Sequence, residues 1–408
     1  MTAHRFAIAT ILGFLLLACI ALLCVGILRE AAGTNSYALL AEGWLNWRFD
    51  TDRCFDTDCA IYDGKTYVIF PPMPGLIALP FVALFGVNFA FFMPLTALSF
   101  ALTGWLWWRI ANHEAVTRDV AVLLVLLVLF ATPLFFVALR GDHVWFFAQS
   151  WGFLFSSAAL YFAVVRPSAL LAGLFIGMAF LCRQMAILYL PFLYVMLLDS
   201  KTPLLRIDMA AVRRGFALAA FPVLALAIYF LYNYARFGSP LETGYAYILP
   251  LDLSEGAPEP SVLRLRVQEL GIFSSQYFIV NLVYMFINGP HIEFAGRHMT
   301  ELAGFDTYGA SPFLVTPALL FALLARWDRS FWFGAGTIAL ILGATLFYHS
   351  NGHSQYSAQR YMLDWLPVLL IFLLRGVQPA FAPPLSILTA YSIFVTLSMV
   401  VVGGVLAL

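Results

Sequence analysis

The most regular feature of the sequence is a series of long apolar runs separated by short polar loops. Uncharged runs of about 17 residues or more are long enough to cross a hydrocarbon core about 30 Å thick as helices. We therefore expect an all-α, polytopic membrane protein with about ten to twelve transmembrane helices. The segments that we assign as crossings are residues 6–28, 89–110, 119–139, 146–165, 167–182, 185–198, 215–235, 311–325, 331–348, 362–376 and 383–407.

Two further apolar stretches are expected to form surface helices. Residues 70–88 contain four prolines, which break the backbone hydrogen bonds that a lipid-exposed helix needs. Residues 271–288 are interrupted by polar side chains. This leaves two long outer loops, about 29–88 and 236–310. In the alternative interpretation both stretches cross, and the loops between them move to the inner side.

The distribution of charges supports this orientation. With the N-terminus inside, the inner loops carry 11 of the 22 lysines and arginines but only 5 of the 22 acids. An excess of cations beside short loops marks the cytoplasmic side of a membrane protein. The outer side then holds the other 17 acids, so we expect chemistry in the outer loops.

Composition excludes several classes of protein. Hydrophobic residues make up 62% of the chain and charged residues 11%, against roughly half and a quarter in soluble domains. The net charge is zero and basic residues form no run, so we expect membrane lipid as a partner and no nucleic acid. We read residues 1–408 as one transmembrane domain. The first apolar run is longer than a signal peptide's core, so we expect it to be a retained helix.

The first outer loop gathers most of the candidate chemistry. A carboxylate at a membrane surface can act as a general base toward a hydroxyl group. Spaced Asp-x-Asp pairs can bind a divalent cation, for which Asp50, Asp52 and Asp56 are candidates. Cys54 and Cys59 are candidates for a disulfide if the loop faces an oxidising compartment. The plainer interpretation is a solvated acidic loop.

Three other outer segments carry polar groups. Asp142 and His143 lie in a short loop between two apolar segments and form a candidate acid–base or binding pair. Arginines and tyrosines in the other two segments could bind the phosphate of a lipid-linked donor, or form an aromatic belt with cations that reach the interface. These candidate binding residues are Arg236, Glu242, Tyr245, His353, Arg360 and Tyr361.

Four segments, taken in order, resemble membrane glycosyltransferases of the GT-C superfamily, the branch with protein mannosyltransferases and lipid A aminoarabinose transferases. The resemblance covers nearly the whole chain. It rests on residues 62–67 running into Phe-Pro-Pro-Met-Pro at 70–74, on Gly-Met-Ala-Phe-Leu-Cys-Arg at 177–183, on residues 233–245, and on Gln-Arg-Tyr-Met-Leu-Asp at 359–364.

The resemblance implies a transferase of hexosyl or pentosyl groups with polyprenyl-phosphate donors. It implies a site at the periplasmic face of a bacterial inner membrane and a lipid, glycan or protein acceptor of the cell envelope. Relatives carry an essential acid in the first outer loop, often as Asp-Glu, where this chain has Thr34-Asn35. The acids that remain open are Glu30, Asp50, Asp52, Asp56 and Asp58.

We favour Asp58 as the first acid because it directly precedes the motif that starts near Asp63, whose Asp63, Lys65 and Tyr67 are expected to contact substrate. Asp142 matches the second acid of the family. The competing hypothesis is a transporter or a flippase of lipid-linked glycans. Transport usually leaves ionisable groups near the middle of the membrane, and here the charges fall in loops or near helix ends.

Overall fold

The computed structural model describes residues 2–56, 58–114, 116–198, 203, 208–248, 262–352 and 355–406. The protein is 69% helical, an all-α polytopic membrane protein. The α-helices are α1 (Thr2–Leu28), α2 (Ser36–Leu45), α3 (Met73–Phe85), α4 (Phe92–His113), α5 (Arg118–Phe130), α6 (Pro133–Leu139), α7 (Val144–Val164), α8 (Ala169–Phe180), α9 (Leu190–Met196), α10 (Met209–Phe237), α11 (Val262–Leu270), α12 (Phe278–Phe286), α13 (Pro312–Val315), α14 (Arg329–Leu346), α15 (Leu366–Gly376) and α16 (Ala382–Val401).

Shorter helical turns and two small hairpins complete the described part. The turns are η1 (Gln184–Tyr189), η2 (Tyr245–Tyr247), η3 (Ser275–Tyr277), η4 (Pro317–Leu324), η5 (Arg360–Asp364), η6 (Pro379–Phe381) and η7 (Val402–Leu406). The antiparallel pairs are β1 (Cys59–Tyr62) with β2 (Lys65–Val68), and β3 (Ile292–Ala295) with β4 (Glu301–Phe305).

Every segment that the apolar pattern predicts as a crossing contains helix. Five stretches of the described chain are long and apolar enough to span by themselves: Phe6–Leu28, Val144–Val164, Met209–Phe237, Arg329–Leu346 and Pro379–Gly404. Others, such as α8 and α15, are shorter than the roughly 20 residues of a full crossing. The number of crossings therefore stays a prediction.

The predicted crossing at 119–139 is bent by 51° between α5 and α6. Pro133 starts α6 and has no N–H group, so it cannot continue the helix that precedes it. The Thr132 hydroxyl caps the new helix by accepting from the Leu134 N–H at 3.3 Å. The two stretches expected at the surface form α3 and α12, which are 13 and 9 residues long.

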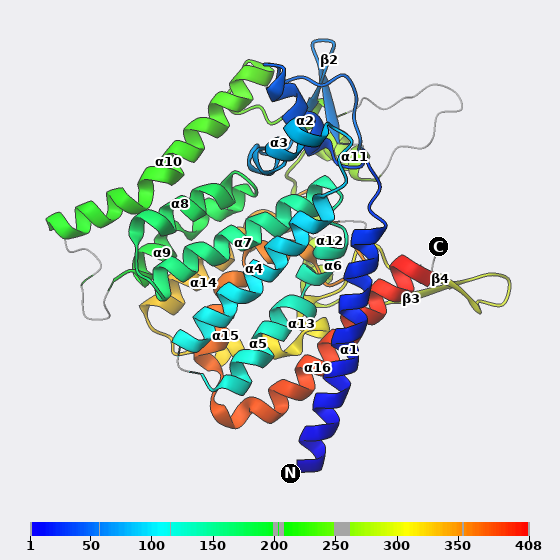
Figure 1. Ribbon diagram of the computed structural model, residues 1–408, viewed down its shortest axis with the longest axis vertical. Coiled ribbons are helices and arrows are strands. Elements are labelled where there is room, and N and C mark those ends of the chain that lie inside the picture. The colour runs from blue at the N-terminus through cyan, green and yellow to red at the C-terminus, as the bar shows by residue number, and fades with distance from the viewer. Residues whose placement is uncertain are drawn as a thin grey trace.

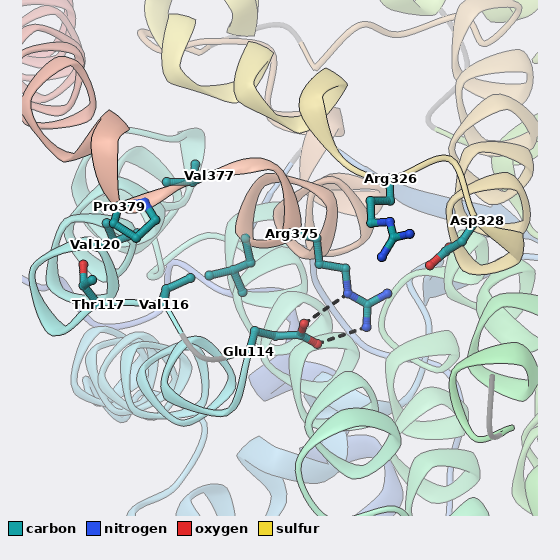
Figure 2. A pocket seen from close by; sticks show the side chains of 10 residues that line it. Glu114, Val116, Thr117, Val120, Arg326, Asp328, Arg375, Val377 and Pro379 are labelled. Atoms are coloured by element: carbon teal, nitrogen blue, oxygen red, sulfur yellow. Dashed lines mark hydrogen bonds and ion pairs between the residues drawn. The ribbon is translucent and has the colours of Figure 1, made fainter.

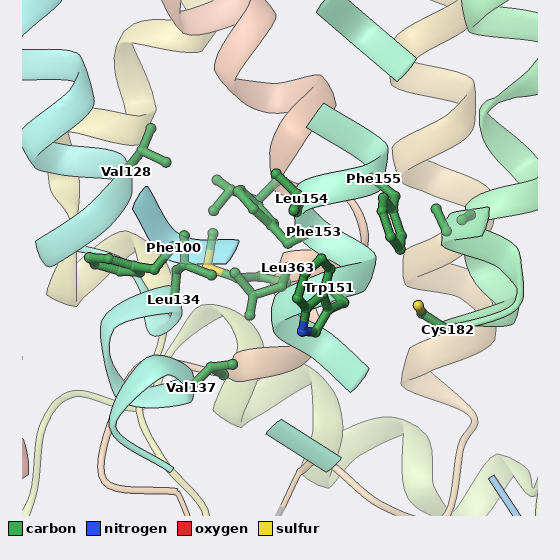
Figure 3. Close-up of a cluster of buried hydrophobic side chains, with 14 of the residues drawn as sticks. Phe100, Val128, Leu134, Val137, Trp151, Phe153, Leu154, Phe155, Cys182 and Leu363 are labelled. Carbon is green, nitrogen blue, oxygen red and sulfur yellow. The ribbon is translucent and has the colours of Figure 1, made fainter. Parts of the chain in front are cut away.

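Helix α7 forms the centre of the bundle, with 94% of its apolar window buried (Figure 1). Figure 3 shows Trp151, Phe153 and Leu154 of this helix among side chains of α4, α5 and α6. A helix apolar on all sides is stable only when neighbours surround it. The surrounding helices therefore hold the two ends of α7 in fixed positions.

Small residues bring α8 and α10 together. A Cβ atom on Gly173 would lie 2.3 Å from the Leu218 carbonyl oxygen, and one on Gly177 would lie 3.0 Å from the Phe221 carbonyl oxygen. The Gly-x-x-x-Gly spacing allows two membrane helices to pack backbone against backbone. This contact fixes α10, whose last turn supports the β1–β2 hairpin at the top of Figure 1.

Candidate active site

The β1–β2 hairpin separates the acids of the first outer loop. Cys54 and Cys59 form a disulfide with a Cα–Cα distance of 6.1 Å, and the loop that it closes contains Asp58. The hairpin turns at Asp63 and Gly64, which both have positive φ angles of 50° and 70°, as a two-residue hairpin turn requires. Asp58 therefore lies at the base of the hairpin, whereas Asp63 is exposed at its tip.

Asp58 is bound at the start of α7. Its Oδ2 accepts a hydrogen bond from Trp145 Nε1 at 2.7 Å, and its backbone N–H donates to Asp56 Oδ1 at 3.0 Å. Burial, together with the nearby charge of Asp56, raises the pKa of Asp58 to about 6, although Trp145, Arg264 and Arg360 oppose the rise. Asp58 is thus ionised at neutral pH and is a stronger base than an ordinary carboxylate.

Arg360 places a buried positive charge near Asp58. Its Nη1 donates to Gln149 Oε1 at 2.8 Å and its Nε to the Gly352 carbonyl at 3.1 Å. Within the described residues, no carboxylate lies at ion-pair distance from this guanidinium, yet its charge acts on Asp58. Burying a cation without a paired anion is costly. The arrangement is therefore suited to an anion that arrives as a ligand.

Tyrosines border the same region. Tyr245 of η2 makes a side-chain hydrogen bond with Tyr348, and both Tyr361 and Asp58 lie close enough to act on its hydroxyl. Tyr361 lies under Arg360, with the guanidinium carbon 5.1 Å from the ring centroid. We call the group Asp58, Trp145, Tyr245, Arg360 and Tyr361 the Asp58 site. It combines a base, a cation and hydroxyl donors.

An ion pair behind the Asp58 site joins two of the sequence motifs. Arg183, which follows α8, binds Asp364 of η5 through two hydrogen bonds of 2.9 and 2.5 Å. The Arg183 guanidinium carbon lies 5.2 Å from the centroid of the Tyr361 ring. A bidentate pair of this kind fixes both orientation and distance. It therefore holds η5, and Arg360 with it, against the end of α8.

Asp142 and His143 lie beside the Asp58 site. His143 Nδ1 is 2.9 Å from Asp142 Oδ1, and the imidazole is stacked on the Trp145 indole with 6.4 Å between centroids. The charge of His143 also lowers the pKa of Asp56, against the stronger effect of burial. The pair therefore adjoins both loop acids through the first residues of α7.

Glu30 is a further acid in this region. Its carboxylate accepts from the backbone N–H groups of Phe92 and Met93 at 2.7 and 3.1 Å, so it caps α4. Burial raises its pKa to about 7, and the nearby Asp142 contributes to the rise. Helix capping accounts for the position of Glu30 without a role in chemistry.

The other predicted residues make contacts of their own, outside the group that we call the Asp58 site. Lys65 is at the exposed hairpin tip, 3.8 Å from Asp50. Tyr67 packs on Phe237, and the Glu242 carboxylate accepts from the N–H of Gly244. Arg236 donates to the Val68 carbonyl. His353 lies outside the described residues.

The metal candidates do not form one cluster. Asp52 is bound by Arg48 at 3.0 Å, and Asp50 is 3.7 Å from the same arginine. In the described part of the chain, the group of potential ligands that lies close together is Cys54, Asp56 and Cys59. The two sulfur atoms of that group form the disulfide and are not thiolates.

Three contributors were not among the predicted site residues: Trp145, Arg183 and Asp364. Trp145 adjoins the Asp142–His143 pair, and the other two close the quoted motifs at 177–183 and 359–364. Charged residues that end an apolar motif were the available signal. No signal in the sequence indicated that Arg183 and Asp364 pair with each other, because they are 181 residues apart in the chain.

No protein-family model and no curated protein match this sequence. The structure is similar to two solved structures of ArnT from Cupriavidus metallidurans, one bound to undecaprenyl phosphate and one in the apo state. The first has a TM-score of 0.49 and 16% identity over 91% of this chain. The second has a TM-score of 0.46 and 15% identity over 94%. This chain covers 61% and 62% of those two chains.

Proposed function

We propose that this protein is a membrane glycosyltransferase that moves a sugar from a polyprenyl-phosphate donor to a hydroxyl acceptor. The observation that carries the proposal is a half-buried base, Asp58, close enough to feel the charge of a buried cation, Arg360, that lacks a carboxylate partner among the described residues. Both belong to an all-helical membrane protein, where a lipid-linked donor can keep its tail in the bilayer while its phosphate reaches the site.

In the proposed reaction the acceptor's hydroxyl oxygen attacks the anomeric carbon of the donor sugar. The bond from that carbon to the phosphate oxygen breaks, and the polyprenyl phosphate leaves with the electron pair. The hydroxyl proton passes to Asp58, whose pKa of about 6 suits a base at neutral pH. Arg360 and the Tyr245 hydroxyl stabilise the charge that develops on the leaving phosphate.

Asp142 is proposed to act beside this centre rather than in it. Its carboxylate lies 2.9 Å from His143 Nδ1, and the His143 ring is stacked on the Trp145 side chain, which donates to Asp58. Such a chain of contacts would orient the base. The sugar and the acceptor would be selected by other groups around the Asp58 site, which bind neither the proton nor the phosphate.

The site is proposed to face the periplasm from a bacterial inner membrane. The excess of acids on that side and of cations on the other supports this orientation. Reporter fusions at residues 60, 142, 207 and 260 test it directly. A fusion at residue 142 that reports from the cytoplasm would reverse the topology and overturn this part of the proposal.

The activity is tested with purified protein in lipid nanodiscs, radiolabelled polyprenyl-phosphate sugars and an extract of cell-envelope acceptors. We expect label to move from donor to acceptor and free polyprenyl phosphate to accumulate in equal amount. If no donor supports transfer and the protein moves lipid-linked glycan across the membrane of liposomes, it is a flippase instead.

A further inference from the structure

A pocket of about 290 Å³ is lined by the residues drawn in Figure 2. The Glu30 carboxylate caps the start of α4, and Arg360 precedes α15. Both helices end at this pocket, which therefore lies at the end of the bundle opposite to Glu30 and Arg360. The start of α5 and the loop before α14 complete it. The proposed transfer reaction uses none of the residues that line this pocket. One wall of the pocket is apolar and consists of Val116, Val120, Leu374, Val377 and Pro379.

Two of the four charges in the pocket neutralise each other. Arg375 binds both carboxylate oxygens of Glu114, at 3.1 and 3.0 Å, and its Nη1 donates to Ser330 Oγ at 2.8 Å. A bidentate pair of this kind is rigid and has little remaining capacity for a ligand. It therefore forms a fixed side of the pocket.

The other two charges, Arg326 and Asp328, remain open to a ligand. Among the described residues, none lies at ion-pair or hydrogen-bond distance from the Arg326 guanidinium, and Figure 2 shows it beside the Asp328 carboxylate. Asp328 uses Oδ1 to accept from Ser330 Oγ at 2.6 Å and from the Phe331 N–H at 3.0 Å, which caps α14. Its Oδ2 takes part in neither bond.

Asp328 is charged at neutral pH. Burial would raise its pKa, but the hydrogen bonds from Ser330 and Phe331 outweigh that effect and the pKa is lowered. The open part of the pocket thus presents one positive and one negative group, with no net charge. A purely anionic ligand would meet repulsion from Asp328, whereas a ligand that carries both charges would satisfy both groups.

The surroundings of the pocket are typical of a membrane interface. Trp327, which directly follows Arg326, and Trp332 are 66% and 58% exposed. Trp327 is stacked on Phe331, and Trp332 contacts the same ring edge-on. Tryptophans of this kind gather at the level of lipid headgroups. A phospholipid could therefore enter from the adjoining leaflet, with its acyl chains remaining among other lipids.

We propose that this pocket binds the headgroup of a zwitterionic phospholipid with a primary ammonium group. The phosphate is held by Arg326, the ammonium by Asp328 Oδ2, and the glycerol and first acyl carbons lie on the apolar wall. The proposal concerns binding only and does not depend on the transferase activity.

The test measures lipid retention by the full-length protein in detergent, using native mass spectrometry with added phosphatidylethanolamine or phosphatidylglycerol. Arg326→Gln should weaken the binding of both lipids about tenfold, because a charge-assisted hydrogen bond to the phosphate is lost. Asp328→Asn keeps an Oδ1 acceptor for the α14 cap but removes the charge. This variant should bind phosphatidylethanolamine about tenfold more weakly and should bind phosphatidylglycerol equally well or more tightly.

Arg166→Gln is the matched control, since Arg166 is an exposed arginine just after α7 and outside the pocket. This variant should bind both lipids as tightly as the original chain does. Equal loss of both lipids in Asp328→Asn, or no loss in Arg326→Gln, would overturn the zwitterion assignment. Soluble phosphoethanolamine should compete only weakly because it lacks the apolar contacts. If it bound as tightly as the lipid, the ligand would be a small solute.

Discussion

Two buried arginines of the outer segments differ in what surrounds them. Arg236, at the end of α10, donates to the Val68 carbonyl at 2.6 Å and to Asn233 Oδ1 at 2.8 Å, and its guanidinium carbon lies 3.8 Å from the centroid of the Tyr232 ring. Arg360 also binds two neutral acceptors, but its charge acts on Asp58. We call the first group, Val68, Tyr232, Asn233 and Arg236, the hairpin junction.

The difference teaches how one residue type can perform two tasks in one protein. In the hairpin junction the arginine joins the backbone of β2 to α10, so its donors are used for folding. In the Asp58 site the arginine lies near a base and tyrosine hydroxyls, so its charge acts on groups that can take part in a reaction. Burial alone would not distinguish them, since they are 3% and 5% exposed.

The largest expected effect is on Asp58. We expect Asp58→Asn to lower the rate of sugar transfer by about 100-fold or more, because the amide cannot accept the hydroxyl proton. Transfer is measured with radiolabelled donor at pH 7 and expressed per folded protein. Asp63→Asn, at the exposed tip of the same hairpin, is the control and should retain activity. Equal activity in both variants would mean that another acid is the base.

The second prediction separates the two arginines. We expect Arg360→Gln to lower transfer by about 100-fold, in the range found when one group that stabilises a developing negative charge is removed. The melting temperature of this variant should stay close to that of the original chain, although its transfer rate falls. Fluorescence-monitored unfolding in detergent and the transfer assay, run on the same preparation, provide the two measurements.

Arg236→Gln should behave in the opposite way. The Val68 carbonyl would lose its donor, and an unsatisfied buried acceptor costs about 1–3 kcal/mol of stability. We expect a lower melting temperature, with transfer per folded protein close to that of the original chain. Loss of transfer in folded Arg236→Gln protein would instead support the predicted contact between Arg236 and the substrate.

The disulfide gives a third, smaller effect. Replacing Cys54 and Cys59 by serine opens a loop whose ends are 5 residues apart. On the chain-entropy estimate this removes about 2 kcal/mol of stability. Because the loop carries Asp58, transfer should fall several-fold along with the melting temperature. Cys24→Ser, at an exposed free cysteine of α1, is the control. Unchanged stability and transfer would show that the hairpin alone holds Asp58.

The helices could be predicted from sequence because the length and apolarity of a run are local properties. The bend between α5 and α6 also has a local cause, Pro133, but the shortness of α8 and α15 depends on what packs around them. The site is similar in this respect. Asp58 and Arg360 could be named from motifs, but the hydrogen bond from Trp145 to Asp58 joins residues 87 positions apart. Nor does any sequence pattern separate Arg236 from Arg360.

The smallest expected effect concerns the pH dependence of transfer. Transfer requires ionised Asp58, so the rate should be full above its pKa and fall as the pH drops through about 6. Trp145→Phe removes a hydrogen bond that lowers this pKa, and the acid limb should move to higher pH. Asp56→Asn removes a charge that raises it, and the limb should move to lower pH. Each shift should be up to about one pH unit. Rates measured between about pH 5 and pH 8 separate the two directions, and shifts of the same sign in both variants would mean that the titrating group is not Asp58.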